Sequence, residues 1–72
     1  MSIDNSETLR KELGENIRTA REKAKLTQAE VAAMADIDVN YYARIERGLA
    51  IPSYEKLHSI MKSLKMESLE VK

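Results

Sequence analysis

Few of the chain's 72 residues have side chains that could catalyse a reaction or hold a metal ion. Cysteine is absent, His58 is the single histidine, and two glycines are too few for a glycine-rich phosphate loop. Acidic residues are plentiful, but a chain this short builds no deep pocket to raise the pKa of a carboxyl group. We therefore expect no enzyme, no cofactor, no metal site and no small-molecule ligand.

With catalytic and metal-binding groups excluded, the distribution of charged residues is the next guide to function. Twelve Lys and Arg residues balance twelve Asp and Glu residues. Residues 10–25 contain six basic and three acidic residues, whereas residues 26–43 contain three acidic and no basic ones. A nucleic-acid-binding protein without surplus positive charge must gather its basic groups on one face. We expect modest non-specific affinity for DNA and a weak dependence on salt if this chain is such a protein.

Composition also indicates location and assembly. No apolar run approaches the roughly 20 residues that span a membrane. The first eight residues are polar and acidic apart from Ile3 and the initial Met, which does not resemble a cleavable signal. We therefore expect a cytoplasmic protein. Because a small domain without disulfides is only marginally stable, a homodimer is also expected.

A first helix is predicted by apolar residues at steps of 4, 4, 3 and 4, ending near Lys25. These residues are Leu9, Leu13, Ile17, Ala20 and Ala24. Gly14 interrupts this helix at a cost of about 1 kcal/mol relative to Ala. We expect that it allows close packing against a neighbouring element. Residues 1–8 are expected to be a flexible lead-in, with a single domain over residues 9–72.

Residues 28–48 predict two short helices joined by a tight turn. Thr27 and Glu30 form a capping box for a helix over residues 28–35. Asp38 is a cap for a second helix over residues 39–47, which Gly48 ends in a left-handed conformation. A steep crossing of these helices needs a small side chain, which Ala32 supplies, and a left-handed residue at Asp36.

A fourth helix is predicted after Pro52 and Ser53, which give a further cap signal. Its apolar stripe consists of Leu57, Ile60, Met61 and Leu64. Met66, Leu69 and Val71 predict either a short fifth helix or a frayed end. No alternating strand pattern competes with these helices, so the predicted fold class is all-α.

Several spaced motifs resemble the XRE or Cro/C1-type repressor family. They are Gly14-x-x-Ile17-Arg18-x-x-Arg21, Leu26-Thr27-Gln28-x-Glu30-Val31-Ala32, Tyr42-Ala43-Arg44-Ile45-Glu46-Arg47-Gly48 and Pro52-Ser53. The likeness covers about residues 9–65. Residues 38–48 also resemble the controller proteins of restriction-modification systems within that family. The resemblance implies a lambda-repressor-like domain of four or five helices with a central helix-turn-helix.

The resemblance also implies site residues. The helix from Val39 would lie in the DNA major groove, where Asn40 could pair with adenine, Arg44 with guanine, and Val39 or Ala43 with a thymine methyl group. Contacts to DNA phosphates are implied for Gln28, Tyr41, Arg47 and Ser53. Arg21 and Glu46 match an ion pair of the family. The expected dimer surface consists of Ile60, Met66, Leu69 and Val71.

Plainer interpretations of the same residues stay open. Arg44 and Arg47 could be solvated surface arginines, and Asn40 and Gln28 could serve only to start their helices. Tyr42 is expected in the core, while Tyr41 could either pack or contact phosphate. The expected function is a sequence-specific transcriptional regulator, a repressor or autoregulator acting as a homodimer on double-stranded DNA. The alternatives are the antitoxin of a toxin–antitoxin pair, and a protein-interaction module that retains the fold.

Overall fold

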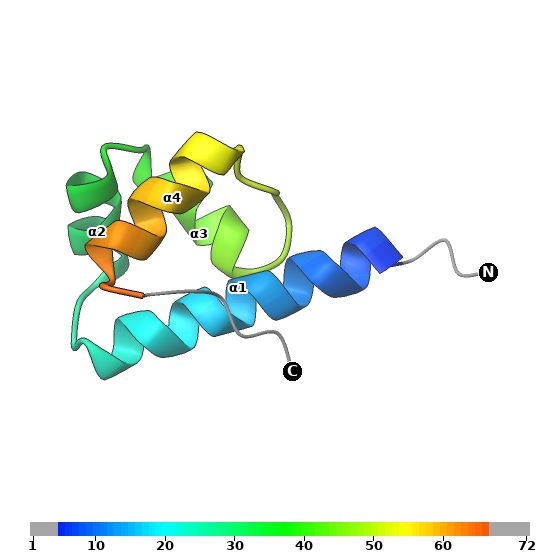
Figure 1. Ribbon diagram of the computed structural model, residues 1–72, viewed down its shortest axis with the longest axis horizontal. Coiled ribbons are helices and arrows are strands. Elements are labelled where there is room, and N and C mark those ends of the chain that lie inside the picture. Colours follow the sequence, from blue (N-terminus) through cyan, green and yellow to red (C-terminus); the bar gives the residue numbers. More distant parts are fainter. Residues whose placement is uncertain (1–4, 67–72) are drawn as a thin grey trace.

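Caps and apolar spacing produce four α-helices in the part of the chain that the structure describes, residues 5–66 of a computed structural model (Figure 1). They are α1 (Asn5–Lys23), α2 (Gln28–Ala35), α3 (Val39–Glu46) and α4 (Tyr54–Ser63). The all-α prediction is confirmed. The region of the predicted fifth helix lies mostly outside the described residues.

The long helix α1 packs mainly on α3. In Figure 1 it runs beneath the other helices. Helix α3 packs on α1, and α2 packs on both α3 and α4. Their inner faces form one core. Its buried apolar residues are Ile17, Val31, Ala32, Ala35, Tyr42, Ile45, Ile60 and Leu64.

Two expectations for α1 were wrong. The helix begins at Asn5, so residues 5–8 belong to it and not to a lead-in. Leu9 and Ala24 belong to the apolar series that predicted this helix, and such a series normally packs inward, but both are exposed, Leu9 to 55 %. The short helices cover only the middle of α1, around Ile17, and the ends of a 19-residue helix extend past them. The prediction for Gly14 is confirmed, because an added Cβ would lie 2.8 Å from the carbonyl carbon of Glu46.

All four helices end in the same way. In each, a residue with positive φ donates its N–H to the carbonyl three residues back, and the next residue donates to the carbonyl five residues back. The positive-φ residues are Lys25, Asp36, Gly48 and Lys65. An apolar residue follows each of them, namely Leu26, Ile37, Leu49 and Met66. The sequence predicted this conformation at Asp36 and Gly48 and missed it at the two lysines.

Candidate nucleic-acid interface

The outer face of α3 carries the predicted base-contacting residues. Asp38 caps the helix by accepting a hydrogen bond from the Tyr41 N–H at 3.0 Å. Tyr42 and Ile45 are fully buried on the inner face. Because α-helical positions four apart share a face, Asn40 and Arg44 lie together, on the side of the helix away from Tyr42. Both are exposed, Val39 at the start of the helix is 40 % exposed, and Ala43 is half-buried.

The turn before α3 sets the direction of that face. Ala32 is buried, and its carbonyl accepts the N–H of Ile37 at 2.9 Å. Asp36 has φ 60° and ψ 47°, a left-handed conformation that the sequence predicted. The Thr27 hydroxyl accepts from the Glu30 N–H at 3.0 Å, and the Glu30 carboxylate accepts from the Thr27 N–H at 2.8 Å. The predicted capping box and the predicted left-handed turn between α2 and α3 are confirmed.

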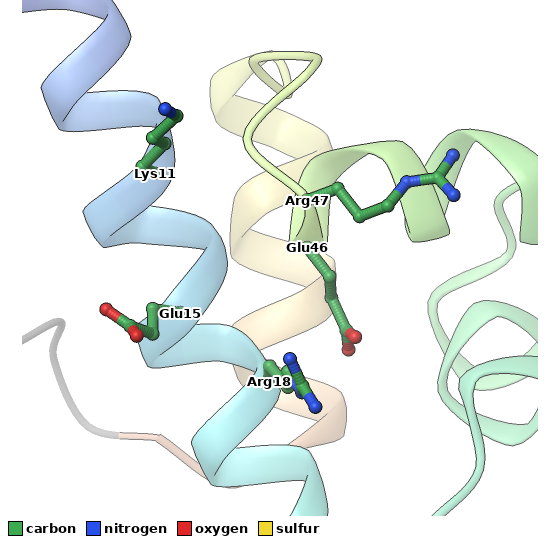
Figure 2. Close-up of a pocket in the computed structure, with 5 residues that line it drawn as sticks. All are labelled: Lys11, Glu15, Arg18, Glu46 and Arg47. Carbon is green, nitrogen blue, oxygen red and sulfur yellow. The ribbon is translucent and has the colours of Figure 1, made fainter.

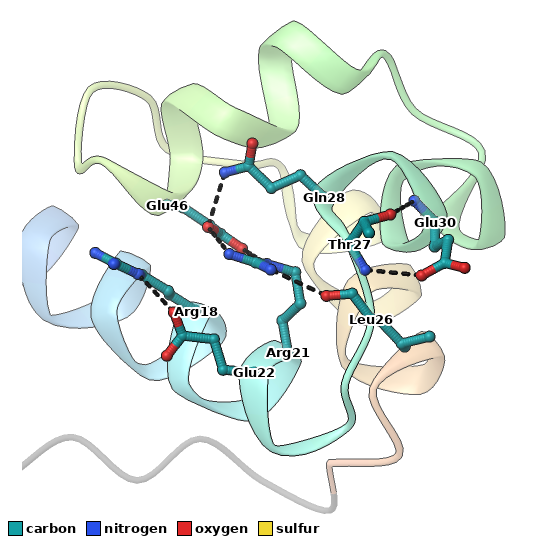
Figure 3. Close-up of polar contacts among 8 residues, drawn as sticks. All are labelled: Arg18, Arg21, Glu22, Leu26, Thr27, Gln28, Glu30 and Glu46. Atoms are coloured by element: carbon teal, nitrogen blue, oxygen red, sulfur yellow. Dashed lines mark hydrogen bonds and ion pairs between the residues drawn. The ribbon is translucent and has the colours of Figure 1, made fainter.

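The end of α3 is fastened to α1 by an ion pair (Figure 3). Arg21 donates from Nε to Oε2 of Glu46 at 2.7 Å and from Nη2 to Oε1 at 3.1 Å. Its Nη1 donates to the Leu26 carbonyl at 3.0 Å. The Glu46 side chain is 2 % exposed and that of Arg21 is 14 % exposed. These two residues therefore form a buried, bidentate pair that holds α3 against α1.

A second donor reaches the same carboxylate. Nε2 of Gln28, at the start of α2, donates to Oε1 of Glu46 at 2.9 Å. Burial by itself raises the pKa of Glu46, but the neighbouring Arg21, Tyr42 and Gln28 side chains outweigh it, so the pKa lies below its ordinary value. Burial raises the pKa of the Tyr42 hydroxyl, and the neighbouring Glu46 carboxylate raises it further, so this hydroxyl stays protonated.

Sequence reasoning missed this contact of Gln28. The resemblance assigned the glutamine to a DNA phosphate, and no local pattern relates residue 28 to residue 46. The available signal was the pairing of a buried carboxylate with one arginine, since a carboxylate accepts more hydrogen bonds than one guanidinium donates to it. A further neutral donor is therefore expected near Glu46.

The other residues predicted to contact phosphate lie around α3 in different settings. Arg47 is exposed and lines a shallow surface pocket with Lys11, Glu15, Arg18 and Glu46; Figure 2 shows its guanidinium extending away from α1. Of the remaining two residues, Tyr41 of α3 contacts the loop between Gly48 and α4, and Ser53 belongs to that loop. Tyr41 is half-buried and its hydroxyl donates to the Ile51 carbonyl at 3.4 Å. Ser53 caps α4 by accepting from the Lys56 N–H at 3.2 Å.

Residues of α1 that the sequence did not single out reach the same end of α3. Nε of Arg10 donates to the Gly48 carbonyl at 3.2 Å. The aliphatic stem of Lys11 packs so closely on Gly48 that an added Cβ would lie 2.8 Å from its Cγ. The surplus of basic residues in residues 10–25 was the available signal. Two of these side chains lie beside the turn that follows α3.

The expected dimer surface needs a correction. Ile60 is fully buried in the core of its own chain, so its assignment to that surface was wrong. Helix α4, which carries this residue, packs on α2. Met66 is half-buried against the core, while Leu69 and Val71 lie outside the described residues.

Within residues 5–66 no group of three acidic, His or Cys side chains gathers as metal ligands would. Over the same range no helix has both the length and the apolar character to cross a membrane.

In the comparisons with known proteins, a family model described as Helix-turn-helix matches residues 17–71, more than half of the chain. No curated protein matches. The matched span contains α2, the turn and α3, and the chain belongs to the XRE or Cro/C1-type helix-turn-helix family of DNA-binding transcriptional regulators.

Proposed function

We propose that this protein is a sequence-specific regulator that binds operator half-sites through α3 in the DNA major groove. The exposed face of α3 carries the proposal. Val39, Asn40 and Arg44 present an apolar group, an amide and a guanidinium outward, while Tyr42 and Ile45 anchor the opposite face in the core. A major groove about 12 Å wide admits one such helix.

Each outward side chain suits one type of base contact. We assign Arg44 to guanine, because a guanidinium donates two parallel hydrogen bonds to O6 and N7. Asn40 suits adenine, to which an amide both donates and accepts. Val39 and Ala43 suit the methyl group of thymine. These four residues would determine the preferred half-site.

Residues around α3 would hold the helix in register on the DNA backbone. Arg47 is exposed next to α3 and supplies a charge, while Gln28, Tyr41 and Ser53 supply neutral donors. The hydroxyls of Tyr41 and Ser53 already take part in hydrogen bonds within the chain. A hydroxyl both donates and accepts, so Ser53 can cap α4 and still donate to a phosphate. The one hydroxyl proton of Tyr41 is donated to the Ile51 carbonyl at 3.4 Å, so Tyr41 would have to release this long bond before it donates to a phosphate.

Repression or autoregulation by a homodimer is the role we propose. Two copies related by a twofold axis would contact half-sites about 34 Å apart. Large apolar side chains that stay exposed in the described residues support association, among them Leu49, Ile51 and Tyr54. Sedimentation over a range of protein concentrations tests the dimer. A mass that remains that of one chain at every concentration, with and without DNA, would exclude it.

Selection of bound duplexes from a random pool tests the DNA proposal. We expect an enriched, twofold-symmetric sequence. The Arg44→Ala variant should lose about 1–3 kcal/mol of binding free energy and its preference at one base pair in each half-site. Arg18→Ala, an exposed arginine of α1, is the control and should keep that preference. If Arg44→Ala lost the same binding free energy on every DNA sequence, Arg44 would be reassigned to a contact with the DNA backbone.

A protein-interaction module is the second candidate, and the charge of residues 26–43 favours it. This segment includes α2 and most of α3, and it contains Glu30, Asp36 and Asp38 but no basic residue. Like charges oppose the approach of a polyanion. A mobility-shift measurement with random duplex at low salt separates the two candidates, because an interaction module would show no binding even at micromolar protein.

A further inference from the structure

We infer that Glu46 is a positioning residue for DNA binding, because its buried carboxylate orients the side-chain amide of Gln28 toward a DNA phosphate. The inference rests on the proposed function and goes beyond it. In this arrangement the ion pair of Arg21 and Glu46 also orients Gln28 for its contact with the DNA backbone. Glu46 itself never touches the DNA, since its side chain is 2 % exposed.

The side-chain amide of Gln28 points its nitrogen toward Glu46. An ionised carboxylate only accepts hydrogen bonds, so Gln28 must turn its nitrogen and not its oxygen toward Glu46. The 2.9 Å bond from Nε2 to Oε1 has this arrangement (Figure 3). An amide that is free in solution presents either atom with similar ease. The carboxylate therefore selects one of two orientations.

The bond to Glu46 leaves one hydrogen of the Gln28 amide nitrogen for a second acceptor. The nitrogen of a primary amide carries two hydrogens, and Glu46 accepts one of them. The other remains on a half-buried residue at the first position of α2, which is the position assigned to the DNA backbone. A phosphate oxygen, like a carboxylate, only accepts. The same nitrogen can therefore donate to both anions, which the amide oxygen could not do.

The buried carboxylate of Glu46 carries a negative charge beneath the surface that we propose for DNA, a polyanion. An uncompensated carboxylate at this place would repel the DNA phosphates. Arg21 cancels that charge with two hydrogen bonds, at 2.7 and 3.1 Å. Arg21 thus allows an acidic residue to orient a donor at the DNA surface. The amide of Gln28 is ordered when the chain folds, so the entropy cost of ordering this side chain does not weaken DNA binding.

Titration with the selected operator duplex tests the inference, at a temperature where circular dichroism shows every variant folded. Gln28→Ala should weaken binding by about threefold to tenfold, the worth of one hydrogen bond. The slope of affinity against salt should stay unchanged, because a neutral amide displaces no counterion. Asn16→Ala, which removes an amide from α1, is the matched control and should bind like the parent chain.

The role of Glu46 is tested by combining substitutions. Glu46→Ala should weaken binding, and adding Gln28→Ala to it should cost much less than the same change costs in the parent chain. If Glu46→Ala does not fold, the side-chain amide protons of Gln28 in the parent chain provide the measurement by NMR. We expect two resolved protons, of which DNA shifts one while the other keeps its bond to Glu46.

Three results would overturn the inference. They are equal binding by Gln28→Ala and the parent chain, fully additive losses in the double variant, and a shift of both amide protons together on DNA binding. In each case DNA binding by α3, followed through the backbone signals of Asn40 and Arg44, would still stand. Absence of any binding by the parent chain would instead remove the proposed function itself.

Discussion

The guanidinium of Arg21 and the carboxylate of Glu46 meet at 2.7 Å although 25 residues separate them in the sequence. They join the last turn of the long helix α1 to the last residue of α3. Since α3 carries the proposed base contacts, this pair helps to fix the direction in which those side chains point. A buried ion pair often adds little net stability compared with apolar packing, and its usual contribution is a defined geometry.

Removal of Arg21 should be costly. Arg21→Ala removes the cation that pairs with the buried carboxylate of Glu46, while the Gln28 amide stays as a neutral donor, and we expect a loss of about 3–5 kcal/mol in the free energy of unfolding. Arg18→Ala is the control, because Arg18 pairs with Glu22 at the surface and should contribute only about 0.3–0.5 kcal/mol. Urea unfolding measures both. Similar midpoints for the two variants would contradict the buried pair.

The lowered pKa of Glu46 makes stability depend on pH. The pKa is below its ordinary value of 4.5 in the folded chain, so the unfolded chain binds a proton more readily. The stabilisation from this group is complete above pH 4.5 and is lost as the pH falls through the folded value. We expect urea unfolding between pH 7 and 3 to show a smaller acid loss for Glu46→Gln than for the parent chain. Parallel losses in both proteins would refute this assignment.

Gly14 permits the close contact between α1 and α3. An alanine Cβ would lie 2.8 Å from the carbonyl carbon of Glu46 and closer still to the carbonyl oxygens of Ile45 and Glu46. Backbone cannot move aside as a flexible side chain does, so we expect Gly14→Ala to cost about 1–3 kcal/mol despite its higher helix propensity. The control is Glu15→Ala, on the exposed face of the same helix. Thermal unfolding should separate the two variants; a more stable Gly14→Ala would mean that the helices can part without cost.

Lys25 should be more stable as glycine. Its φ is 61°, a conformation that costs a residue with a side chain roughly 1–2 kcal/mol. Glycine avoids this cost but gives up more backbone entropy on folding, so we expect Lys25→Gly to gain about 0.5–1 kcal/mol. Lys23→Gly, inside α1, should instead lose about 0.5–1 kcal/mol. Thermal unfolding of both variants is the measurement, and a loss at both positions would contradict the left-handed helix end.

The amino-acid sequence by itself determined the local features of this protein. Thr27, Asp38 and Ser53 cap the helices that were predicted, and Asp36 and Gly48 adopt the predicted left-handed conformations. These features depend on groups within a few residues of one another, so they follow from short patterns. The family resemblance added the long-range pair of Arg21 and Glu46, which no local pattern gives.

Tertiary structure decided what depends on residues far apart in the chain. It placed Gln28 on Glu46, buried Ile60 within its own chain, and left Leu9 beyond the reach of the short helices. The apolar spacing of α1 and α4 shows which face is inward, but not how far the neighbouring elements cover it. The lengths of the helices and the way they cross decide how much of each apolar face is buried. Hydrogen bonds between separate helices form only once the helices are packed in that arrangement.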